Sequence, residues 1–130
     1  MPLVFFHPTK KLPAIDENRV TQHADILLSV LDLLGVPQSP RLLWGRSVFN
    51  NAVPGLAINF TGGTWWLASG THYLQKRNET QMQYGILPRP GEAFSDADKK
   101  AEPPENMTKI LHAAMQYFNQ GLRENRMLVP

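Results

Sequence analysis

The sequence predicts an α+β fold in which one strand and one helix precede a four-stranded antiparallel meander, and a C-terminal helix packs on that meander. Three patterns predict this fold. Apolar residues recur at helical spacing between Thr21 and Gly35. Short alternating segments separated by turn residues fill positions 56–87, and a second amphipathic pattern runs over 105–126.

The bulk composition excludes several classes of protein. The chain has 130 residues, of which 42% are hydrophobic, and this suits one modest globular domain. Net charge is +2, and adjacent lysines occur only at Lys10-Lys11 and Lys99-Lys100, so we expect no nucleic-acid partner. The absence of cysteine excludes disulfides and thiolate metal sites. No apolar stretch reaches the length of a bilayer span, so we expect no membrane segment in this chain.

Residues 1–36 are predicted to be the end of an α/β core. Leu3–Phe6 is a short apolar run typical of a strand buried on both faces, and a polar loop follows it over residues 7–20. In the helix that comes next, Thr21 is the predicted N-cap and Gly35 the C′ residue. Because both flanks of this helix are apolar, we expect it to pack on a sheet and to be covered by a further element.

The rest of the chain is predicted to be a linker over residues 37–54 and an antiparallel sheet plus a helix over residues 55–130. The expected strands are 56–60, 64–68, 71–76 and 80–87, separated by short turns that contain glycine, serine or asparagine. Residues 88–105 are expected to form a surface loop, and the final helix to cover 105–126.

Two adjacent tryptophans lie in the second predicted strand. Trp65-Trp66 places one indole on each face of that strand, because successive side chains in a strand point to opposite sides. We expect one indole in the core and the other under a helix. An exposed indole would instead be able to stack on a sugar or a base.

The residues show no complete active site. No Ser or Thr lies in a nucleophile elbow, and no glycine loop of the phosphate-binding kind is present. The four histidines, which are His7, His23, His72 and His112, lack metal-binding spacing. We therefore predict no catalytic residue and no metal site within the chain.

Four residues are predicted to lie near a substrate, namely Lys10, Lys11, His23 and Arg46. The two lysines follow the first strand, where an α/β sheet places its ligands, and the alternative is a pair of solvated side chains. His23 lies at a helix start, where anions bind. The guanidinium of Arg46 is a candidate phosphate contact, and the alternative is a structural turn in which Arg46 pairs with a loop carbonyl or carboxylate.

Several short motifs occur in a fixed order along the chain. They are the strand within residues 2–8, Gln22-His23-Ala24-Asp25-Ile26 at the helix start, Leu31–Gly35 at its end and the turn Gly45–Phe49. The alternating start of the meander at 56–60 and the closing helix complete the series. In these motifs the chain resembles the C-terminal part of the sulfatase branch of the alkaline phosphatase superfamily. It is most similar to the lipoteichoic-acid-synthase-like (phosphoglycerol transferase-like) members, and the resemblance covers nearly the whole chain.

The resemblance implies a fragment of an α/β sulfatase-like domain. In this family the nucleophile and the ligands of a divalent metal (Mn, Mg, Ca or Zn) come from segments before this strand. We therefore expect the chain to begin inside a longer protein and to be catalytically incomplete. The full-length parent would hydrolyse or transfer phosphate or sulfate esters, such as phosphoglycerol or phosphoethanolamine groups on an envelope glycolipid or polymer. It would act outside the cytoplasm, as a membrane-anchored protein.

The fragment interpretation predicts an apolar surface around Leu3–Phe6 and the helix over 21–35, which the missing N-terminal catalytic part would cover. Self-association into a homo-oligomer through the same face is a second expectation. Two alternative interpretations come from other functional classes. One is a stand-alone, non-catalytic binding module that uses the meander and its aromatic residues, and the other is a small metal-independent enzyme.

Overall fold

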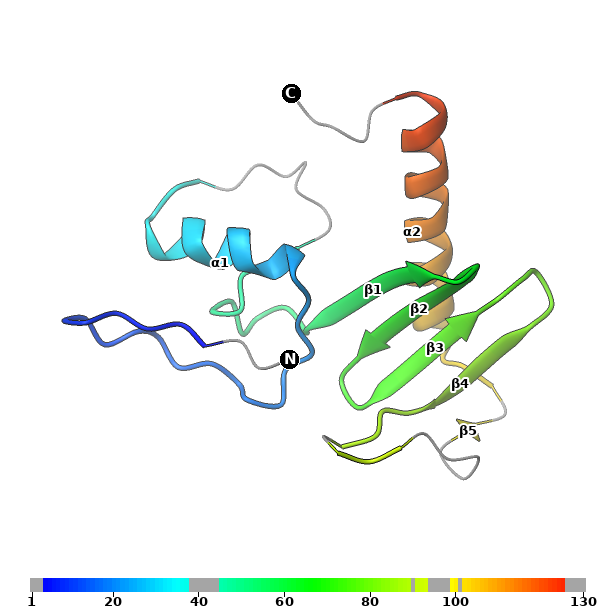
Figure 1. The fold of residues 1–130 in the computed structure, drawn as a ribbon, viewed down its shortest axis with the longest axis horizontal. Coiled ribbons are helices and arrows are strands. Elements are labelled where there is room, and N and C mark those ends of the chain that lie inside the picture. Colours follow the sequence, from blue (N-terminus) through cyan, green and yellow to red (C-terminus); the bar gives the residue numbers. More distant parts are fainter. Residues whose placement is uncertain (1–3, 38–44, 90, 94–98, 101, 126–130) are drawn as a thin grey trace.

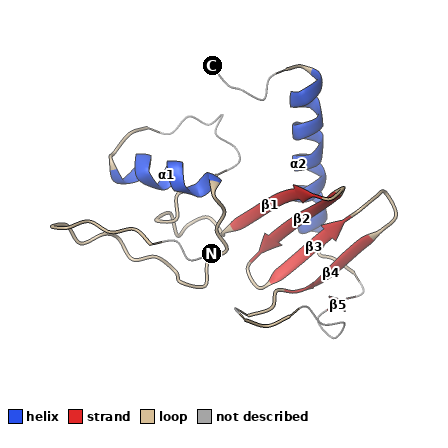
Figure 2. Ribbon diagram, in the orientation of Figure 1, coloured by secondary structure: helices blue, strands red, loops and turns tan. Residues whose placement is uncertain are grey.

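A computed structural model describes residues 4–37, 45–89, 91–93, 99–100 and 102–125. The elements are α1 (Ala24–Leu33), β1 (Leu56–Thr61), β2 (Thr64–Ser69), β3 (His72–Lys76), β4 (Met82–Ile86), β5 (Lys99–Lys100) and α2 (Glu105–Arg123). Figure 1 and Figure 2 show one sheet with α2 against it and α1 beside the start of β1. This arrangement confirms the predicted α+β class, with an N-terminal helix, a four-stranded antiparallel meander and a C-terminal helix that contacts the sheet.

The sheet is antiparallel throughout, with its strands in the order β1-β2-β3-β4-β5. The first hairpin closes through Gly62 and Gly63, whose φ angles of 56° and 74° are both positive, as a type I′ turn requires. β5 was not predicted, because its two residues lie in the segment expected to be a surface loop. Lys99 and Lys100 pair with Gly85 and Tyr84 of β4. The pairing extends the meander by one short edge strand.

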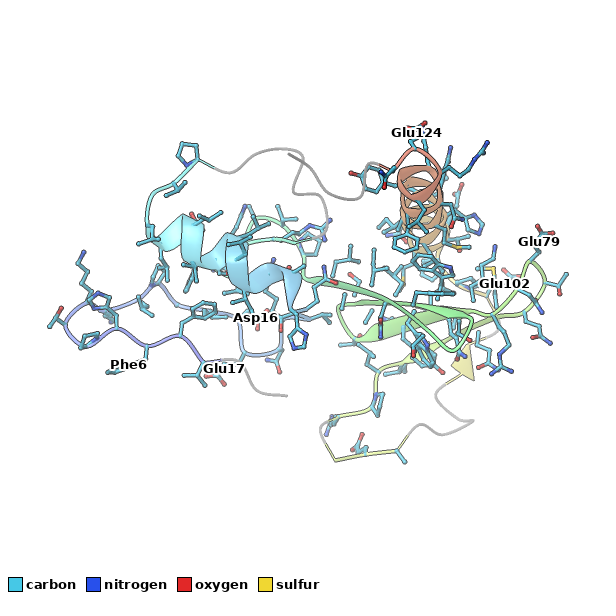
Figure 3. The ribbon with its side chains drawn as sticks, turned by 45° about the horizontal axis from the view of Figure 1, so that its top comes forward. Phe6, Asp16, Glu17, Glu79, Glu102 and Glu124 are labelled. Carbon is cyan, nitrogen blue, oxygen red and sulfur yellow. The ribbon has the colours of Figure 1, made fainter. Side chains whose placement is uncertain are left out.

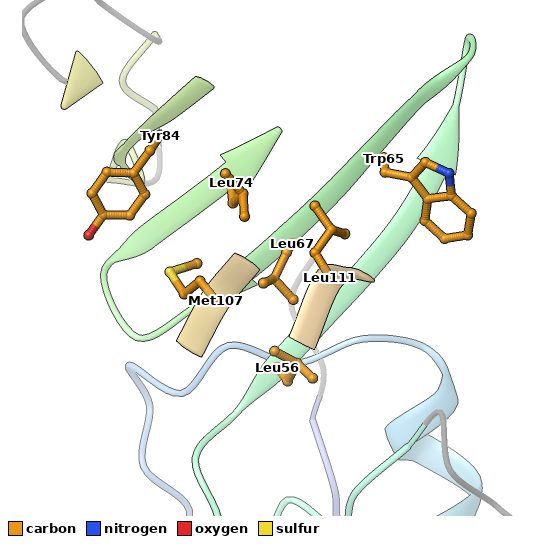
Figure 4. Packing of buried hydrophobic residues seen from close by; sticks show 7 residues of the cluster. All are labelled: Leu56, Trp65, Leu67, Leu74, Tyr84, Met107 and Leu111. Carbon is orange, nitrogen blue, oxygen red and sulfur yellow. The ribbon is translucent and has the colours of Figure 1, made fainter. Parts of the chain in front are cut away.

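The core lies between α2 and one face of the sheet. Its buried members come from four strands and from α2, and they are Leu56, Trp65, Leu67, Leu74, Tyr84, Met107 and Leu111. Figure 4 shows Leu111 of α2 beside Leu67 at the centre of this cluster. Ile58, Met82, Met115 and Phe118 pack around it. The stripe on α2 repeats at positions 107, 111, 115 and 118, which is the spacing of one helix face.

Trp65 and Trp66 point to opposite faces of the sheet, as the sequence predicts. Trp65 is buried in the core, where its ring centroid lies 5.4 Å from that of Phe118 on α2. Trp66 is half-buried on the other face, and its ring centroid lies 6.2 Å from that of Tyr73. The expected helix over this second indole is absent from the described part of the chain, since α2 lies on the Trp65 side.

The two ends of α1 differ in how well the sequence predicts them. Gly35 has a φ of 67° and donates its N–H to the Asp32 carbonyl at 3.0 Å, while Val36 donates to the Leu31 carbonyl at 2.9 Å. This is a Schellman motif, so the prediction of Gly35 at C′ is confirmed. The predicted N-cap, Thr21, is wrong. The N-cap position is His23, which makes no side-chain cap hydrogen bond, and Asp25 accepts the Gln22 N–H at 2.9 Å.

The surroundings of α1 also differ from the prediction. The helix lies beside the start of β1 instead of over a sheet face, and it packs on the loop that begins at Gly45 (Figure 1). Residues 4–6 form no strand, and the side chains of Val4 and Phe6 are 82% and 84% exposed. The predicted strand is therefore wrong for these residues, and Leu3 lies outside the described part. A strand needs a neighbour for its backbone hydrogen bonds, and the described sheet holds only β1–β5.

Candidate functional site

A polar stripe on α1 holds the loop Gly45–Val48, which lies within the linker. Asp25, Ser29 and Asp32 are spaced four and three residues apart, so they share one face of the helix. The Arg46 N–H donates to Asp25 Oδ1 at 2.7 Å, and the Val48 N–H donates to Ser29 Oγ at 3.0 Å. The Ser47 hydroxyl donates to the Asp32 carboxylate. We call Asp25, Ser29, Asp32 and the loop Gly45–Val48 the polar bridge.

The loop backbone approaches the backbone of α1 closely because Gly45 has no side chain. A Cβ atom at Gly45 would lie 2.3 Å from the Ala24 carbonyl oxygen, which is far inside van der Waals contact. The buried polar atoms of the helix are satisfied there. Asp25 is only 2% exposed and accepts from both Gln22 and Arg46, while Ser29 Oγ donates to the Asp25 carbonyl at 2.6 Å. Buried polar groups that are hydrogen-bonded in this way stabilise one arrangement of helix and loop.

A second set of contacts joins this part of the molecule to the sheet. Arg19 Nη1 donates to the carbonyls of Val53 at 2.6 Å and Asn50 at 3.2 Å. Its Nε and Nη2 are buried and have no hydrogen-bond partner among the described residues. The side-chain oxygen of Gln22 accepts the N–H of Ile58 in β1 at 3.0 Å. These contacts fix the segment before α1 to the linker and to the first strand.

A hollow of about 560 Å³ opens beside the polar bridge. Its polar lining includes Asp32, Arg46, Ser47 and Asn50, and the C-terminal end of α1 forms part of its wall. The Arg46 guanidinium makes no hydrogen bond or ion pair with any described residue. Because the Asp32 carboxylate and the carbonyl end of α1 oppose the charge of Arg46, the hollow has no electrostatic preference for an anion.

The four residues predicted to lie near a substrate do not form a common site. Lys10 and Lys11 are exposed in the N-terminal loop, where the Lys10 N–H donates to Nδ1 of His7 at 2.9 Å. His23 is exposed at the start of α1. Arg46 takes part in the polar bridge through its backbone N–H. No hydrogen bond or ion pair connects these four side chains within the described ranges.

The described residues do not present a metal site or an activated nucleophile. No three of their His, Asp and Glu side chains gather closely enough to hold a metal ion. His112 Nε2 lies 2.8 Å from the Lys76 amine, and the ring of His72 stacks on that of Tyr84 at 5.3 Å. Ser47 donates to Asp32 and accepts the Phe49 N–H at 3.2 Å, which is a structural role. No helix in these ranges is long and apolar enough to cross a bilayer.

Sequence reasoning missed the polar bridge, although a signal for it exists. Asp25, Ser29 and Asp32 are the polar positions of a helix whose other residues are nearly all apolar, and they repeat at helical spacing. Their partners, the N–H groups of Arg46 and Val48, are backbone atoms that any residue would supply. The chain matches no protein-family model, no curated protein and no solved structure at a significant level.

Proposed function

We propose that this chain is the C-terminal, catalytically incomplete part of a metal-dependent phosphate- or sulfate-ester hydrolase or transferase of the sulfatase-like kind. The observation that carries the proposal is the orientation of α1. A surface helix normally turns its apolar stripe inward and its polar stripe to solvent. In α1 the polar positions Asp25 and Ser29 are buried, whereas Leu27 and Leu34 are 56% and 70% exposed.

The exposed apolar side chains of α1 form one surface. Leu27, Val30 and Leu34 lie three and four residues apart on α1, so they share a face of the helix. Phe6, 84% exposed, extends from the N-terminal loop away from α2 (Figure 3). We call Leu27, Val30, Leu33 and Leu34 the outer face of α1. An apolar face of this kind marks a contact with another protein surface, and in our proposal the catalytic part of the same enzyme covers it.

The motifs that carry the family resemblance support a structural role for this region. Asp25, the Leu31–Gly35 helix end and Gly45–Val48 are the residues that build the polar bridge and the Schellman motif. They hold scaffold contacts and leave no side chain poised for chemistry. In our proposal the nucleophile comes from outside this chain, and so do the ligands of the divalent metal (Mn, Mg, Ca or Zn). Such a metal would polarise the ester and stabilise its developing charge.

In our proposal this chain is a non-catalytic, structural part of an extracytoplasmic enzyme. Lys10, Lys11 and His23 are exposed and therefore accessible to an anionic substrate held by the catalytic part. Arg46 is half-buried in the polar bridge. The second candidate function, a non-catalytic binding module, is favoured by one observation, the half-buried Trp66 on the sheet face opposite α2.

Two measurements test the proposal. The purified chain should not hydrolyse bis(p-nitrophenyl) phosphate, p-nitrophenyl phosphate or p-nitrophenyl sulfate with Mn²⁺, Mg²⁺, Ca²⁺ or Zn²⁺ added. The gene should encode, in frame before Met1, a segment with a Thr or Ser nucleophile and clustered Asp and His residues. Co-expression of that segment with the chain should yield a stable complex that turns over one of these esters. Metal-stimulated turnover by the chain alone would overturn the proposal.

A further inference from the structure

The two edges of the sheet are built differently. One edge is β5, which has two residues, both of them lysine. Short edge strands and lysine residues both discourage pairing with a further strand. The other edge is β1, which has six residues and contains neither a charged residue nor a proline. Of the two edges, β1 is therefore the one suited to pair with another strand.

The register shows which backbone groups of β1 point outward. Thr61 pairs with Thr64 across the two-residue hairpin turn, so Thr61 and every second residue before it bond to β2. The residues between them turn their N–H and C=O groups away from β2. The Ile58 N–H donates to Gln22 Oε1, which lies outside the sheet, in agreement with this alternation. The outward N–H and C=O of Phe60 make no hydrogen bond with any described residue.

The unpaired part of this edge is accessible. Residues 59–61 are all exposed, and Phe60 is 50% exposed although its ring centroid lies 4.9 Å from that of Trp65. The C-terminal half of α2 extends beyond β1 (Figure 1). The apolar stripe of α2, fully buried at Leu111, continues there to Leu122, which is exposed. A strand added beside β1 would lie under this end of α2 and would cover the exposed side chains of Phe60 and Leu122.

The outer face of α1 is too small to hold the catalytic part of the enzyme by itself. A stable interface takes about 800 Å² and about 20–30 residues from each partner, whereas the outer face consists of four side chains. The contact must therefore extend to neighbouring surface. The unpaired edge of β1 is adjacent, because the hydrogen bond between Gln22 and Ile58 joins the segment before α1 to this strand (Figure 1).

We propose that the catalytic part adds one extended strand to the edge of β1, an inference that rests on the proposed function. The added strand would exchange backbone hydrogen bonds with Phe60 and place an apolar side chain against its ring. On the other face of the sheet its side chains would be polar, to match Asn59 and Thr61. The partner is therefore a segment of the catalytic part in which apolar and polar residues alternate.

Amide hydrogen exchange tests this pairing on the full chain. The probe is the segment encoded before Met1, co-expressed with the chain. In the free chain the Phe60 amide should exchange quickly, whereas the Asn59 amide is protected by its bond to β2. In the complex we expect exchange at Phe60 to slow at least tenfold, with Asn59 as the internal reference. Contact through α1 alone would leave the Phe60 amide in water, so unchanged exchange at Phe60 would overturn the strand pairing.

Two variants at Phe60 separate the backbone contact from the ring. Phe60→Pro removes the outward N–H and leaves the β1–β2 hydrogen bonds in place, and proline is tolerated on edge strands. Phe60→Thr removes the same ring but keeps the N–H, so it is the matched control. Phe60→Pro should bind the catalytic part about tenfold more weakly than Phe60→Thr, the effect of one lost hydrogen bond. Near-UV circular dichroism of the free variants checks that the sheet is intact, and equal affinities of the two folded variants would overturn the pairing.

A complex that does not form and a complex without strand pairing have different meanings. If the parent chain binds no upstream segment, the proposed function and the strand pairing are both overturned. If the complex forms and is lost in the double variant Leu27→Glu, Leu34→Glu, but the Phe60 amide stays unprotected, only the strand pairing is overturned. Should Phe60→Pro fail to fold, the exchange rate at Phe60 in the parent complex decides alone.

Discussion

Asp25 shows how one side chain can connect two distant parts of the sequence. Its two carboxylate oxygens accept the N–H groups of Gln22 and Arg46, which lie 24 residues apart along the chain. The carboxylate is almost fully buried, so water cannot replace either partner. Losing one of these hydrogen bonds costs the full desolvation free energy of the polar group that is left unpaired.

The residue-scale prediction is that Asp25→Asn loosens α1. A carboxamide has one acceptor oxygen, so its NH₂ group would face one of the two N–H donors and leave it unpaired. Leaving a buried donor unpaired costs about 1–3 kcal/mol, so hydrogen-exchange protection of the α1 amides should fall about tenfold or more. Glu17→Gln makes the same change of charge at an exposed side chain and should leave protection unaltered. Equal protection in the two variants would show that the polar bridge does not stabilise the helix.

At the scale of elements, the two helices use their faces in opposite ways. α2 buries Met107 and Leu111 against the sheet and exposes its polar residues, as an amphipathic helix on a sheet should. α1 buries Asp25 and Ser29 together with Leu28, and it exposes Leu27 and Leu33. The exposed apolar surface that the fragment interpretation predicts around the helix is therefore present, and Val4 and Phe6 in the N-terminal segment are exposed as well.

The element-scale prediction concerns self-association of the isolated chain. Because the outer face of α1 exposes leucine side chains to water, the chain should associate as its concentration rises, and sedimentation velocity will detect this. Leu27→Glu combined with Leu34→Glu should abolish the association, since charges on that face cannot be buried against a second copy. Leu122→Glu on α2 is the control, as Leu122 is also 56% exposed but lies outside this face. A strictly monomeric parent chain at all concentrations would contradict the prediction.

At the scale of the whole molecule, the main hydrophobic cluster lies in the C-terminal part. All residues of the core cluster lie between Leu56 and Phe118, and α1 contributes none of them. The segment before the sheet is held by the polar bridge and the hydrogen bonds of Arg19 and Gln22, and Leu28 and Val48 are buried within it. The molecule therefore has one main apolar cluster and a separate, largely polar attachment.

The whole-molecule prediction follows from this division. A fragment of residues 55–125 should retain the near-UV circular dichroism of its buried tryptophan and unfold cooperatively in urea, because the core remains complete. Residues 1–54 alone should show neither a near-UV signal nor cooperative unfolding. α1 has ten residues, and an isolated helix of that length is only marginally stable in water. Loss of the tertiary signal from 55–125 would mean that the polar attachment is required for the core to form.

Local patterns predicted the meander and α2 well. The strands are read from alternation and from turn residues, and the stripe of α2 is read from its helical period, so each signal lies within a short window of sequence. Gly35 is predictable for the same reason, because the left-handed conformation that ends α1 is a property of that residue. The opposite orientations of Trp65 and Trp66 follow from the strand period.

The candidate site was predicted less well, because its contacts depend on backbone atoms and on the packing of distant segments. Sequence singled out Arg46 for its guanidinium, whereas the structure uses its backbone N–H in the polar bridge. Lys10, Lys11 and His23 were chosen for charge and for position relative to an expected strand. That strand is absent over residues 4–6, so the geometry that would have brought them together is absent too.

By itself the sequence determined the α+β class, the hairpins of the meander, the amphipathic face of α2 and the stop of α1 at Gly35. These features depend on residues that are close along the chain. Only the tertiary structure decided which face of α1 is buried, because both flanks are apolar and the choice rests on Gly45 meeting the Ala24 carbonyl and on Asp25 binding Arg46. It also decided that no described helix lies over Trp66 on the second sheet face, since the covering of a face depends on where distant elements pack.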